Sequence, residues 1–135
     1  DRAALKRMTD ALAHRGPDGE GFFIEPGVGL GHRRLSIIDL AGGAQPMTSA
    51  SGESVLIFNG EIYNYRELAR ALQQKGARLR TRSDSEVLLE GLERDGPAYL
   101  DPVRGMFAFA QWNRRARTLL LARDRFGEKP LYYGE

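Results

Sequence analysis

The chain has 135 residues, of which 41% are hydrophobic and 28% charged, and this fits one soluble globular domain over residues 1–135. Membrane association and nucleic-acid binding are not expected. No apolar run approaches the ~20 residues of a membrane-spanning helix, and the small basic surplus, 20 residues against 18, lacks interleaved aromatic residues. The absence of cysteine excludes disulfides, thiolate metal ligands and a cysteine nucleophile within this sequence, and it favours a cytoplasmic protein.

The first third of the chain predicts a helix followed by a β-hairpin. Apolar residues recur at helical spacing over residues 2–14, which predicts an amphipathic helix. The stretch "HRGPDGEG" holds two turn-forming pairs, Gly-Pro and Asp-Gly, and ends that helix. Residues 22–25 and 28–36 are predicted strands joined by a turn at Pro26-Gly27, and the Gly-rich "DLAGGAQPM" then forms a loop.

The rest of the chain predicts a short strand, two helices and a second hairpin. Residues 54–58 form an apolar strand. Asn64 and Ser83 each precede a helical pattern with a Glu three residues later, which is the capping-box spacing, and the two helices end at Gly76 and Gly96. The alternating "GMFAFAQW", the turn "NRRAR" and the strand "TLLLARD" predict a hairpin. Strand pairs interspersed with helices indicate an α+β fold with mostly antiparallel sheets.

Several common kinds of functional site do not match the sequence. Two histidines, His14 and His32, do not make a usual zinc site without cysteine, and each is expected to bond a backbone group near a turn. The glycines of "GPDGEGFF" lack the preceding strand and the following helix of a phosphate-binding loop. The sequence therefore predicts neither a metal nor a cofactor in this domain.

A set of polar residues lies where the predicted strands and helices begin or end. Arg34 interrupts the apolar alternation of "GHRRLSIID", Asn59, Gly60 and Glu61 follow an apolar strand, and Asp84 begins a helix. Each has an ordinary structural interpretation. Arg34 can be a solvated strand residue, Asn59-Gly60 a hairpin turn, and Asp84 an acid that complements the helix dipole.

Together, these residues match the groups of a free amino acid. A guanidinium can form two hydrogen bonds with an α-carboxylate, and carboxylates can bind an α-ammonium. An Asn side-chain N–H and a glycine backbone N–H can form an oxyanion hole, where glycine permits close approach. A nucleophile is missing, because no spacing places a histidine to activate Ser36, Ser83 or Ser85. The residues alone predict an amino-acid pocket with an oxyanion hole.

The chain as a whole resembles a known family. The segments "HRGPDGEG", "GHRRLSIIDLAGGAQPM", "FNGEIYNY", "TRSDSEVLLEGL", "RGMFAFAQW" and "LARDRFGEKPLYY" resemble the glutaminase domain of class II glutamine amidotransferases, in particular that of glutamine-hydrolysing asparagine synthetases. The resemblance implies a four-layer αββα N-terminal-nucleophile hydrolase fold, with two stacked, mostly antiparallel sheets flanked by helices. It also implies hydrolysis of L-glutamine to glutamate and ammonia through a thioester on an N-terminal cysteine.

The resemblance further implies a role for each candidate residue. Arg34 would bind the α-carboxylate of glutamine, Asn59 and Gly60 would form the oxyanion hole, and Glu61 and Asp84 would position the α-amino group. The adjoining wall of the pocket would consist of Leu35, Ser36, Ile37 and Ile38. In such proteins a C-terminal synthetase domain uses ATP and Mg, receives the ammonia and amidates aspartate.

The sequence departs from this family at its start. The "Cys-Gly-Ile" start of family members is missing, and the chain begins at Asp1 and stops within "PLYYGE". We expect truncation at both ends, an inactive isolated polypeptide and an active parent, with a homodimer as one possible assembly. Two alternatives stay open: a relative that amidates another acid, for example in polysaccharide assembly, and a degenerate domain that lost the cysteine and serves as a scaffold or glutamine sensor. The coding sequence upstream of Asp1 distinguishes the enzyme from the scaffold.

Overall fold

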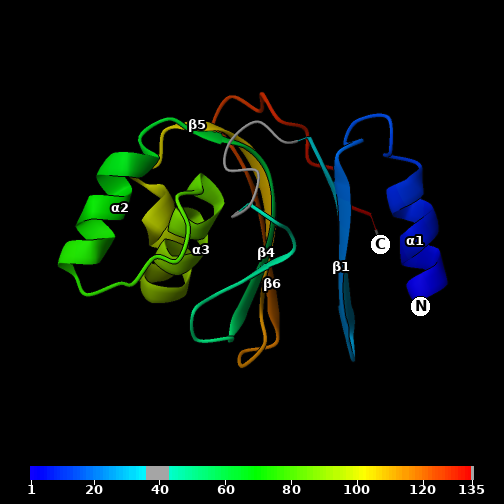
Figure 1. The fold of residues 1–135 in the computed structure, drawn as a ribbon, viewed down its shortest axis with the longest axis horizontal. Coiled ribbons are helices and arrows are strands. Elements are labelled where there is room, and N and C mark those ends of the chain that lie inside the picture. Colours follow the sequence, from blue (N-terminus) through cyan, green and yellow to red (C-terminus); the bar gives the residue numbers. More distant parts are fainter. Residues whose placement is uncertain (36–42, 135) are drawn as a thin grey trace.

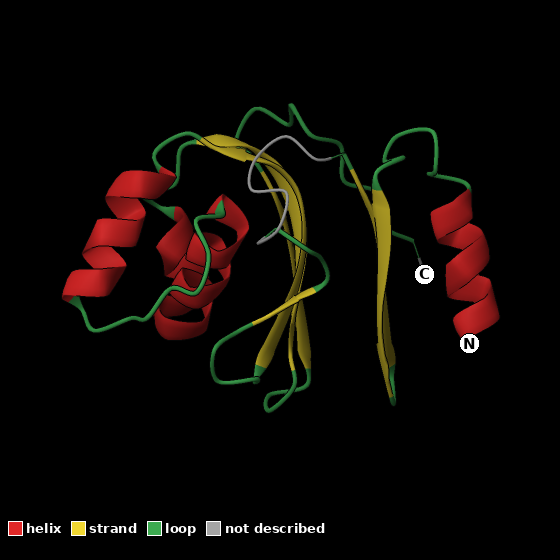
Figure 2. Ribbon diagram, in the orientation of Figure 1, coloured by secondary structure: helices red, strands yellow, loops and turns green. Residues whose placement is uncertain are grey.

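A computed structural model of the chain describes residues 1–35 and 43–134 and arranges them in four layers (Figures 1 and 2). The elements in chain order are α1 (Arg2–Asp10), β1 (Gly19–Glu25), β2 (Val28–Arg34), β3 (Met47–Thr48), β4 (Ser54–Ile62), α2 (Tyr65–Gln74), α3 (Asp84–Asp95), the 3₁₀ helix η1 (Gly96–Leu100), β5 (Gly105–Asn113) and β6 (Thr118–Arg123). Helix α1 covers a two-stranded sheet, and helices α2 and α3 cover a four-stranded sheet stacked on it. The predicted α+β fold with two stacked sheets between helical layers is confirmed.

Both sheets are antiparallel throughout their described strands. The small sheet is the hairpin β1–β2, which turns at Pro26-Gly27 as predicted, with Glu25 opposite Val28. The large sheet has the order β3-β4-β5-β6, and β4 and β5 form its long central pair. The second predicted hairpin is the pair β5–β6, with Asn113 opposite Thr118.

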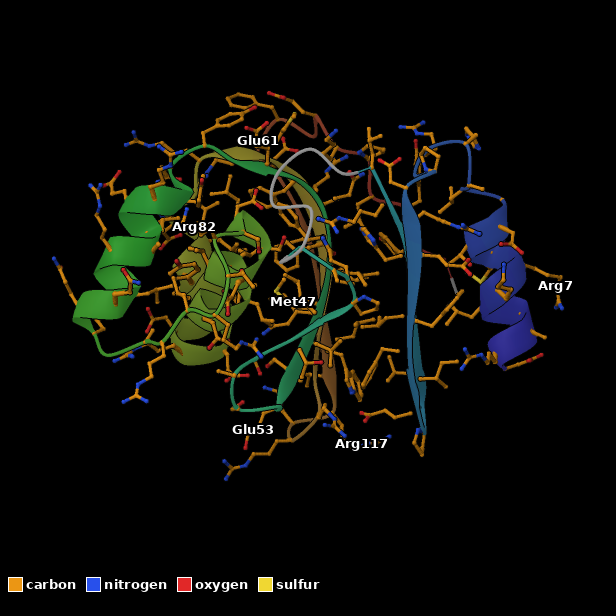
Figure 3. All side chains as sticks on the ribbon, viewed as in Figure 1. Arg7, Met47, Glu53, Glu61, Arg82 and Arg117 are labelled. Atoms are coloured by element: carbon orange, nitrogen blue, oxygen red, sulfur yellow. The ribbon has the colours of Figure 1, made fainter. Side chains whose placement is uncertain are left out.

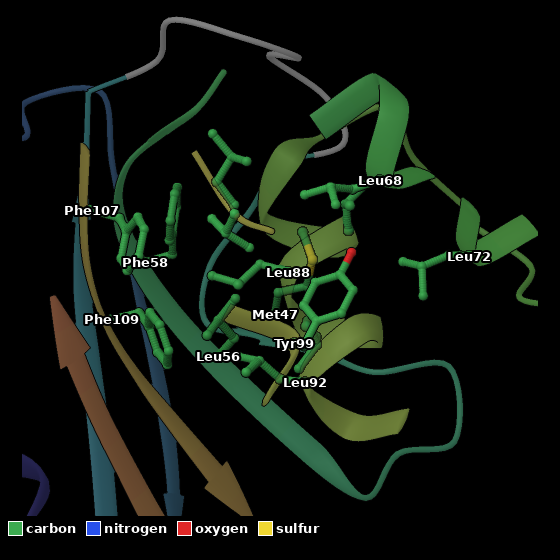
Figure 4. Close-up of a cluster of buried hydrophobic side chains, with 14 residues drawn as sticks. Met47, Leu56, Phe58, Leu68, Leu72, Leu88, Leu92, Tyr99, Phe107 and Phe109 are labelled. Carbon is green, nitrogen blue, oxygen red and sulfur yellow. The ribbon is translucent and has the colours of Figure 1, made fainter. Parts of the chain in front are cut away.

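The four-stranded sheet is buried on both faces, and strand alternation sorts its side chains between two cores. Leu56 and Phe58 of β4, with Phe107 and Phe109 of β5, face the helices (Figure 4). The alternate residues of the same strands pack with Leu30 of β2 between the two sheets: they are Val55, Ala110 and Trp112. Burying a large apolar side chain contributes roughly 1.5–3 kcal/mol, so these two clusters hold the layers together.

The two helices of the outer layer begin differently from the predicted capping boxes. At α3 the Ser83 hydroxyl accepts a hydrogen bond from the Glu86 N–H (3.2 Å), but the Glu86 carboxylate binds the N–H groups of Arg80 and Thr81 instead of turning back to Ser83. At α2 the Asn64 side chain occupies the N-cap position without capping. It bridges instead to the segment before β5, where it donates to the Pro102 carbonyl and accepts from the Arg104 N–H.

Several predicted boundaries are wrong. Strand β1 begins at Gly19 instead of residue 22, and β2 ends at Arg34 instead of residue 36. Helix α1 ends at Asp10 instead of residue 14, and turns follow it. Strand β4 does not turn at Asn59-Gly60 but continues to Ile62, because β5 is long enough to pair with it: Asn59 lies opposite Ala108 and Gly60 opposite Phe107. The Asn-Gly pair is therefore part of a strand and leaves no hairpin interpretation for this motif.

Candidate active site

Strand β4 directs the backbone of Gly60 away from its neighbour β5. Opposite Gly60, the Phe107 N–H donates to the Asp124 carboxylate (3.1 Å) and the Phe107 carbonyl accepts from the Asp124 N–H (2.7 Å), so Phe107 faces β6. In an antiparallel pair, two opposed residues either bond each other or both point outward. The N–H and carbonyl of Gly60 therefore point to the other edge of β4.

Side chains cap that same edge on either side of Gly60. Below it, the Phe58 N–H donates to Gln45 Oε1 (2.5 Å), and the Phe58 carbonyl lies 3.1 Å from His32 Nε2. Above it, the Ile62 N–H donates to Asp84 Oδ2 (2.9 Å). The Gly60 N–H lies between these two capped positions and points the same way, which is the arrangement that an oxyanion donor needs.

Only glycine fits at position 60. A Cβ built on Gly60 would lie 2.1 Å from the Met106 carbonyl oxygen and 2.6 Å from Cα of Phe107. Contacts this short are repulsive, so any side chain here would push β4 and β5 apart. The close approach of the two strands requires the glycine.

Alternation along β4 sends Asn59 and Glu61 toward the two-stranded sheet, on the same face as Val55 and Ile57. The Asn59 side chain is exposed and Glu61 is partly exposed. Figure 3 shows Glu61 at the opposite end of the sheet from Glu53. The two side chains thus face the gap between the sheets, at one end.

Arg34 reaches that end from the other sheet. Along β2, Leu30 packs with Val55 of β4, and His32 is bonded to Phe58, so β2 and β4 advance in the same direction. Arg34 follows two residues later on the same face, about 7 Å further along. This register brings Arg34 level with Gly60 and Glu61.

Asp84 completes the acidic side of the site. It is the first residue of α3, only 7% exposed, and its two carboxylate oxygens accept from the Ile62 and Ser85 N–H groups, both at 2.9 Å. Burial raises the pKa of this carboxyl, the backbone N–H donors oppose that shift, and the nearby Glu61 charge adds to it. A cation between the two acids would relieve both effects, which suits an ammonium group.

The predicted wall of the pocket is only partly described. Leu35 follows β2 with 58% of its side chain exposed. Ser36, Ile37 and Ile38 lie outside the described residues. Asn59, Gly60 and Glu61 of β4 thus lie beside Asp84 of α3, whose carboxylate bonds the β4 edge and feels the charge of Glu61. The register of β2 against β4 puts Arg34 at the same end of the sheets.

One hollow of the described surface lies away from these residues. It has a volume of about 930 Å³ and lies between α2 and the segment 79–82, with Arg66, Arg70, Arg80 and Arg82 among its lining residues. No carboxylate lines it, so it offers nothing to bind the ammonium of an amino acid. We place the candidate site at the β4 edge, on the donors and charges that converge there.

No three His, Asp or Glu side chains gather as a metal site in residues 1–35 and 43–134. None of the helices in that part of the chain is both long and apolar enough to cross a membrane.

Comparison with known proteins identifies the family. A model of the glutamine amidotransferase domain matches residues 1–135. The chain belongs to this family. Glutamine phosphoribosylpyrophosphate amidotransferase from Bacillus subtilis, solved with ADP and GMP, matches this amidotransferase domain with a TM-score of 0.58 and 25% identity, over 71% of this chain and 23% of that one. The predicted N-terminal-nucleophile hydrolase fold is therefore confirmed.

Similar curated proteins narrow the class. Asparagine synthetase [glutamine-hydrolyzing] 1 of Bacillus subtilis (strain 168) is 48% identical over 129 residues, which cover 96% of this chain and 20% of that protein. Asparagine synthetase B [glutamine-hydrolyzing] of Escherichia coli (strain K12) is 42% identical over 133 residues, which cover 98% of this chain and 24% of that protein. The chain thus spans about a fifth to a quarter of the length of these relatives, which are glutamine-hydrolysing asparagine synthetases.

Sequence reasoning missed several side chains that shape the site of this amidotransferase domain. Asp124 accepts hydrogen bonds from four backbone N–H groups, led in effect by that of Lys129, and these hold its pKa at about 2. Glu86, fully buried, holds the segment before Asp84. His32 was expected to bond a backbone group near a turn, and it does bond one, but from within β2. The sequence around Asp124 gives no signal of this role, since it stands between Arg123 and Arg125, and the spacing of Glu86 from Ser83 predicted only a capping box.

Proposed function

We propose that this domain binds L-glutamine and hydrolyses its side-chain amide to give glutamate and ammonia. The observation that carries the proposal is the edge of β4. Its Gly60 N–H points outward between side-chain-capped positions, with the Asp84 carboxylate two residues along the same edge. An oxyanion donor and an ammonium-binding acid at this separation match the two ends of one small amino acid.

The residue roles follow from charge and reach. Arg34 binds the α-carboxylate of glutamine, because a guanidinium can give two parallel hydrogen bonds to a carboxylate. Asp84 and Glu61 bind the α-ammonium group, and its positive charge offsets the cost of burying the Asp84 carboxylate. Asn59 and Gly60 donate to the amide oxygen as it becomes an oxyanion. Leu35 lies next to Arg34 in the chain, and the other predicted wall residues, Ser36, Ile37 and Ile38, lie outside the described residues.

The nucleophile in this proposal is a cysteine of the full-length protein, since these 135 residues contain none. Its sulfur attacks the side-chain amide carbon, the C–N bond breaks with release of ammonia, and water then cleaves the thioester to give glutamate. The 135 residues alone would accordingly release no ammonia. A degenerate domain would bind glutamine without hydrolysing it.

We further propose that the ammonia passes to a synthetase domain of the same polypeptide, which uses ATP and Mg to amidate aspartate in the cytoplasm. The relatives named above support this, because they are glutamine-hydrolysing asparagine synthetases four to five times the length of this chain. This domain itself needs no cofactor for the proposed hydrolysis. A homodimer of the full-length protein is part of the same expectation.

The test is ammonia and glutamate release by the full-length protein supplied with glutamine, with and without ATP and aspartate. Replacing Asn59 by Ala should lower kcat by about 10²–10³ while KM changes little, because one oxyanion donor is lost. Wild-type protein that releases no ammonia would refute the hydrolysis, and ammonia release with amidation of an acid other than aspartate would refute only the acceptor. A change in KM alone would show that Asn59 is not a donor of the oxyanion hole.

A further inference from the structure

The backbone of Phe58 is held by two side chains from distant segments. Its N–H donates to Gln45 Oε1 (2.5 Å), and its carbonyl lies 3.1 Å from His32 Nε2. Strand β3 is paired with β4 at Met47–Leu56 and Thr48–Val55 and begins at Met47, so it offers no strand partner opposite Phe58. The two side chains supply the hydrogen bonds that a longer β3 would have made.

The position of Gln45 in the sequence explains why its side chain takes the place of a strand partner. Extending the β3–β4 register by two residues places Gln45 opposite Phe58. Its main chain packs against β1 instead. A Cβ built on Gly21 would lie 1.9 Å from the Gln45 carbonyl oxygen, so only glycine at position 21 permits this close approach. The Gln45 carbonyl thus lies at Gly21, and Gln45 bonds the Phe58 N–H through its side chain. Gly21 is also the register partner of His32 in the β1–β2 hairpin. Both residues that bond Phe58, His32 and Gln45, are therefore held next to Gly21.

The ring of His32 is suited to hold a carbonyl. A carbonyl oxygen accepts, so Nε2 carries the proton and donates to Phe58. The other nitrogen, Nδ1, is buried and has no hydrogen-bond partner in the described part of the chain. Burial lowers the pKa of His32, the Arg34 charge lowers it further, and the Phe58 carbonyl opposes both. The ring is therefore a neutral donor near pH 7.

The clamp acts on the atoms next to the candidate oxyanion donors. The Phe58 carbonyl and the Asn59 N–H belong to one planar peptide unit, so fixing the carbonyl fixes the orientation of that unit. Two residues above Gly60, the Ile62 N–H is fixed on Asp84 (2.9 Å). The Gly60 N–H thus lies on one strand edge between two residues, Phe58 and Ile62, whose backbone groups are held by side chains.

We propose that His32 and Gln45 are positioning residues that aim the Asn59 and Gly60 donors at the oxyanion. The inference rests on the proposed glutamine hydrolysis and adds two residues that need not touch the substrate. Loss of either anchor should let the 58–60 segment move, and a displacement of about 1 Å in such a donor can cost as much as 10²-fold in rate.

The experiment uses the full-length protein with His32→Ala, Gln45→Ala and the conservative His32→Gln, which keeps a side-chain N–H. The matched control is Gln74→Ala, an exposed glutamine near the end of α2. We expect kcat for ammonia release to fall about 10- to 100-fold in both alanine variants. KM for glutamine and the Kd of glutamate should change less than about twofold, since the groups that bind the α-carbon end are untouched. His32→Gln should recover a large part of kcat.

A second readout separates positioning from general damage. The γ-aldehyde analogue of glutamine forms a tetrahedral oxyanion adduct with the nucleophile, so its inhibition constant should rise by the same factor as kcat falls. An unchanged kcat, a loss confined to KM, or unchanged inhibition by the aldehyde would overturn the inference. If His32→Ala does not fold, Gln45→Ala and His32→Gln decide the question. Wild-type protein without glutaminase activity would instead refute the proposed function on which the inference rests.

Discussion

The two halves of strand β4 use the same backbone in opposite ways. In the lower half, Val55 and Leu56 are 0% exposed, and strands pair with them on both edges, β3 on one and β5 on the other. In the upper half, from Phe58 to Ile62, β5 pairs with one edge only, and side chains cap the other. In the lower half, the backbone hydrogen-bonding groups pair with neighbouring strands. The upper half keeps one N–H, that of Gly60, directed at a site.

This difference separates stability from activity along a single strand. A change in the lower half should destabilise the domain and leave the chemistry of the folded protein intact. A change in the upper half should lower the rate of glutamine hydrolysis more than it lowers stability.

The largest effect is expected from Gly60→Ala, which damages both properties at once. The new Cβ would lie 2.1 Å from the Met106 carbonyl, and the strain should destabilise the fold by about 1–3 kcal/mol. It should also turn the donor N–H, so that kcat falls by more than about 10³. Steady-state ammonia release and chemical denaturation of the full-length protein measure the two losses.

The matched control is Gly29→Ala in β2, where the nearest atom is 3.4 Å from the new Cβ, an ordinary contact. It should leave kcat unchanged within about twofold, since it lies far from the β4 edge. Normal activity in Gly60→Ala would exclude this N–H as an oxyanion donor.

Leu56→Ala tests the lower half. The side chain is fully buried in the core that faces the helices, so its truncation should cost about 2–5 kcal/mol of unfolding free energy. At a temperature where the variant is folded, kcat and KM for glutamine should match the wild type. A loss of kcat in fully folded Leu56→Ala would show that the two halves are coupled.

Arg34→Ala tests whether substrate binding and catalysis in the upper half depend on different residues. Loss of a charge-assisted hydrogen bond costs about 1.5–3 kcal/mol, which raises KM for glutamine roughly 10- to 100-fold. Arg78→Ala removes an exposed arginine outside the site and should change neither constant. A variant with unchanged KM would show that another group holds the α-carboxylate.

The sequence predicts the lower half of β4 better than the upper half, and the reason is physical. Apolar alternation marks Val55, Leu56 and Phe58 as a strand with buried faces, which the structure confirms. The turn predicted at Asn59-Gly60 is wrong, since pairing with β5 overrides the local preference of an Asn-Gly pair.

The charged ends of the site could be proposed from composition and resemblance, but the side chains that cap strand edges could not. Gln45 meets Phe58 across 13 residues and His32 meets it across 26. Such pairs depend on how β1, β2 and β3 stack, and no periodicity in a single segment records that. Asp124 is the same kind of residue, and it anchors the opposite strand.

Asp124→Asn is the smallest expected effect, and its pH dependence tests whether the carboxylate is what holds β5 at Phe107. In the folded protein the four backbone N–H donors keep the pKa of Asp124 at about 2, below the ordinary value of 3.8. A depressed pKa means that the carboxylate contributes stability above pH 3.8, and this contribution is lost as the pH falls toward 2. Asn offers an N–H where backbone donors converge, so the variant should be less stable than the wild type at pH 7. The difference in unfolding free energy should shrink as the pH is lowered from about 4. Denaturation curves of both proteins between pH 7 and pH 3 measure it, and a difference independent of pH would assign the stabilisation to the shape of the side chain instead of its charge.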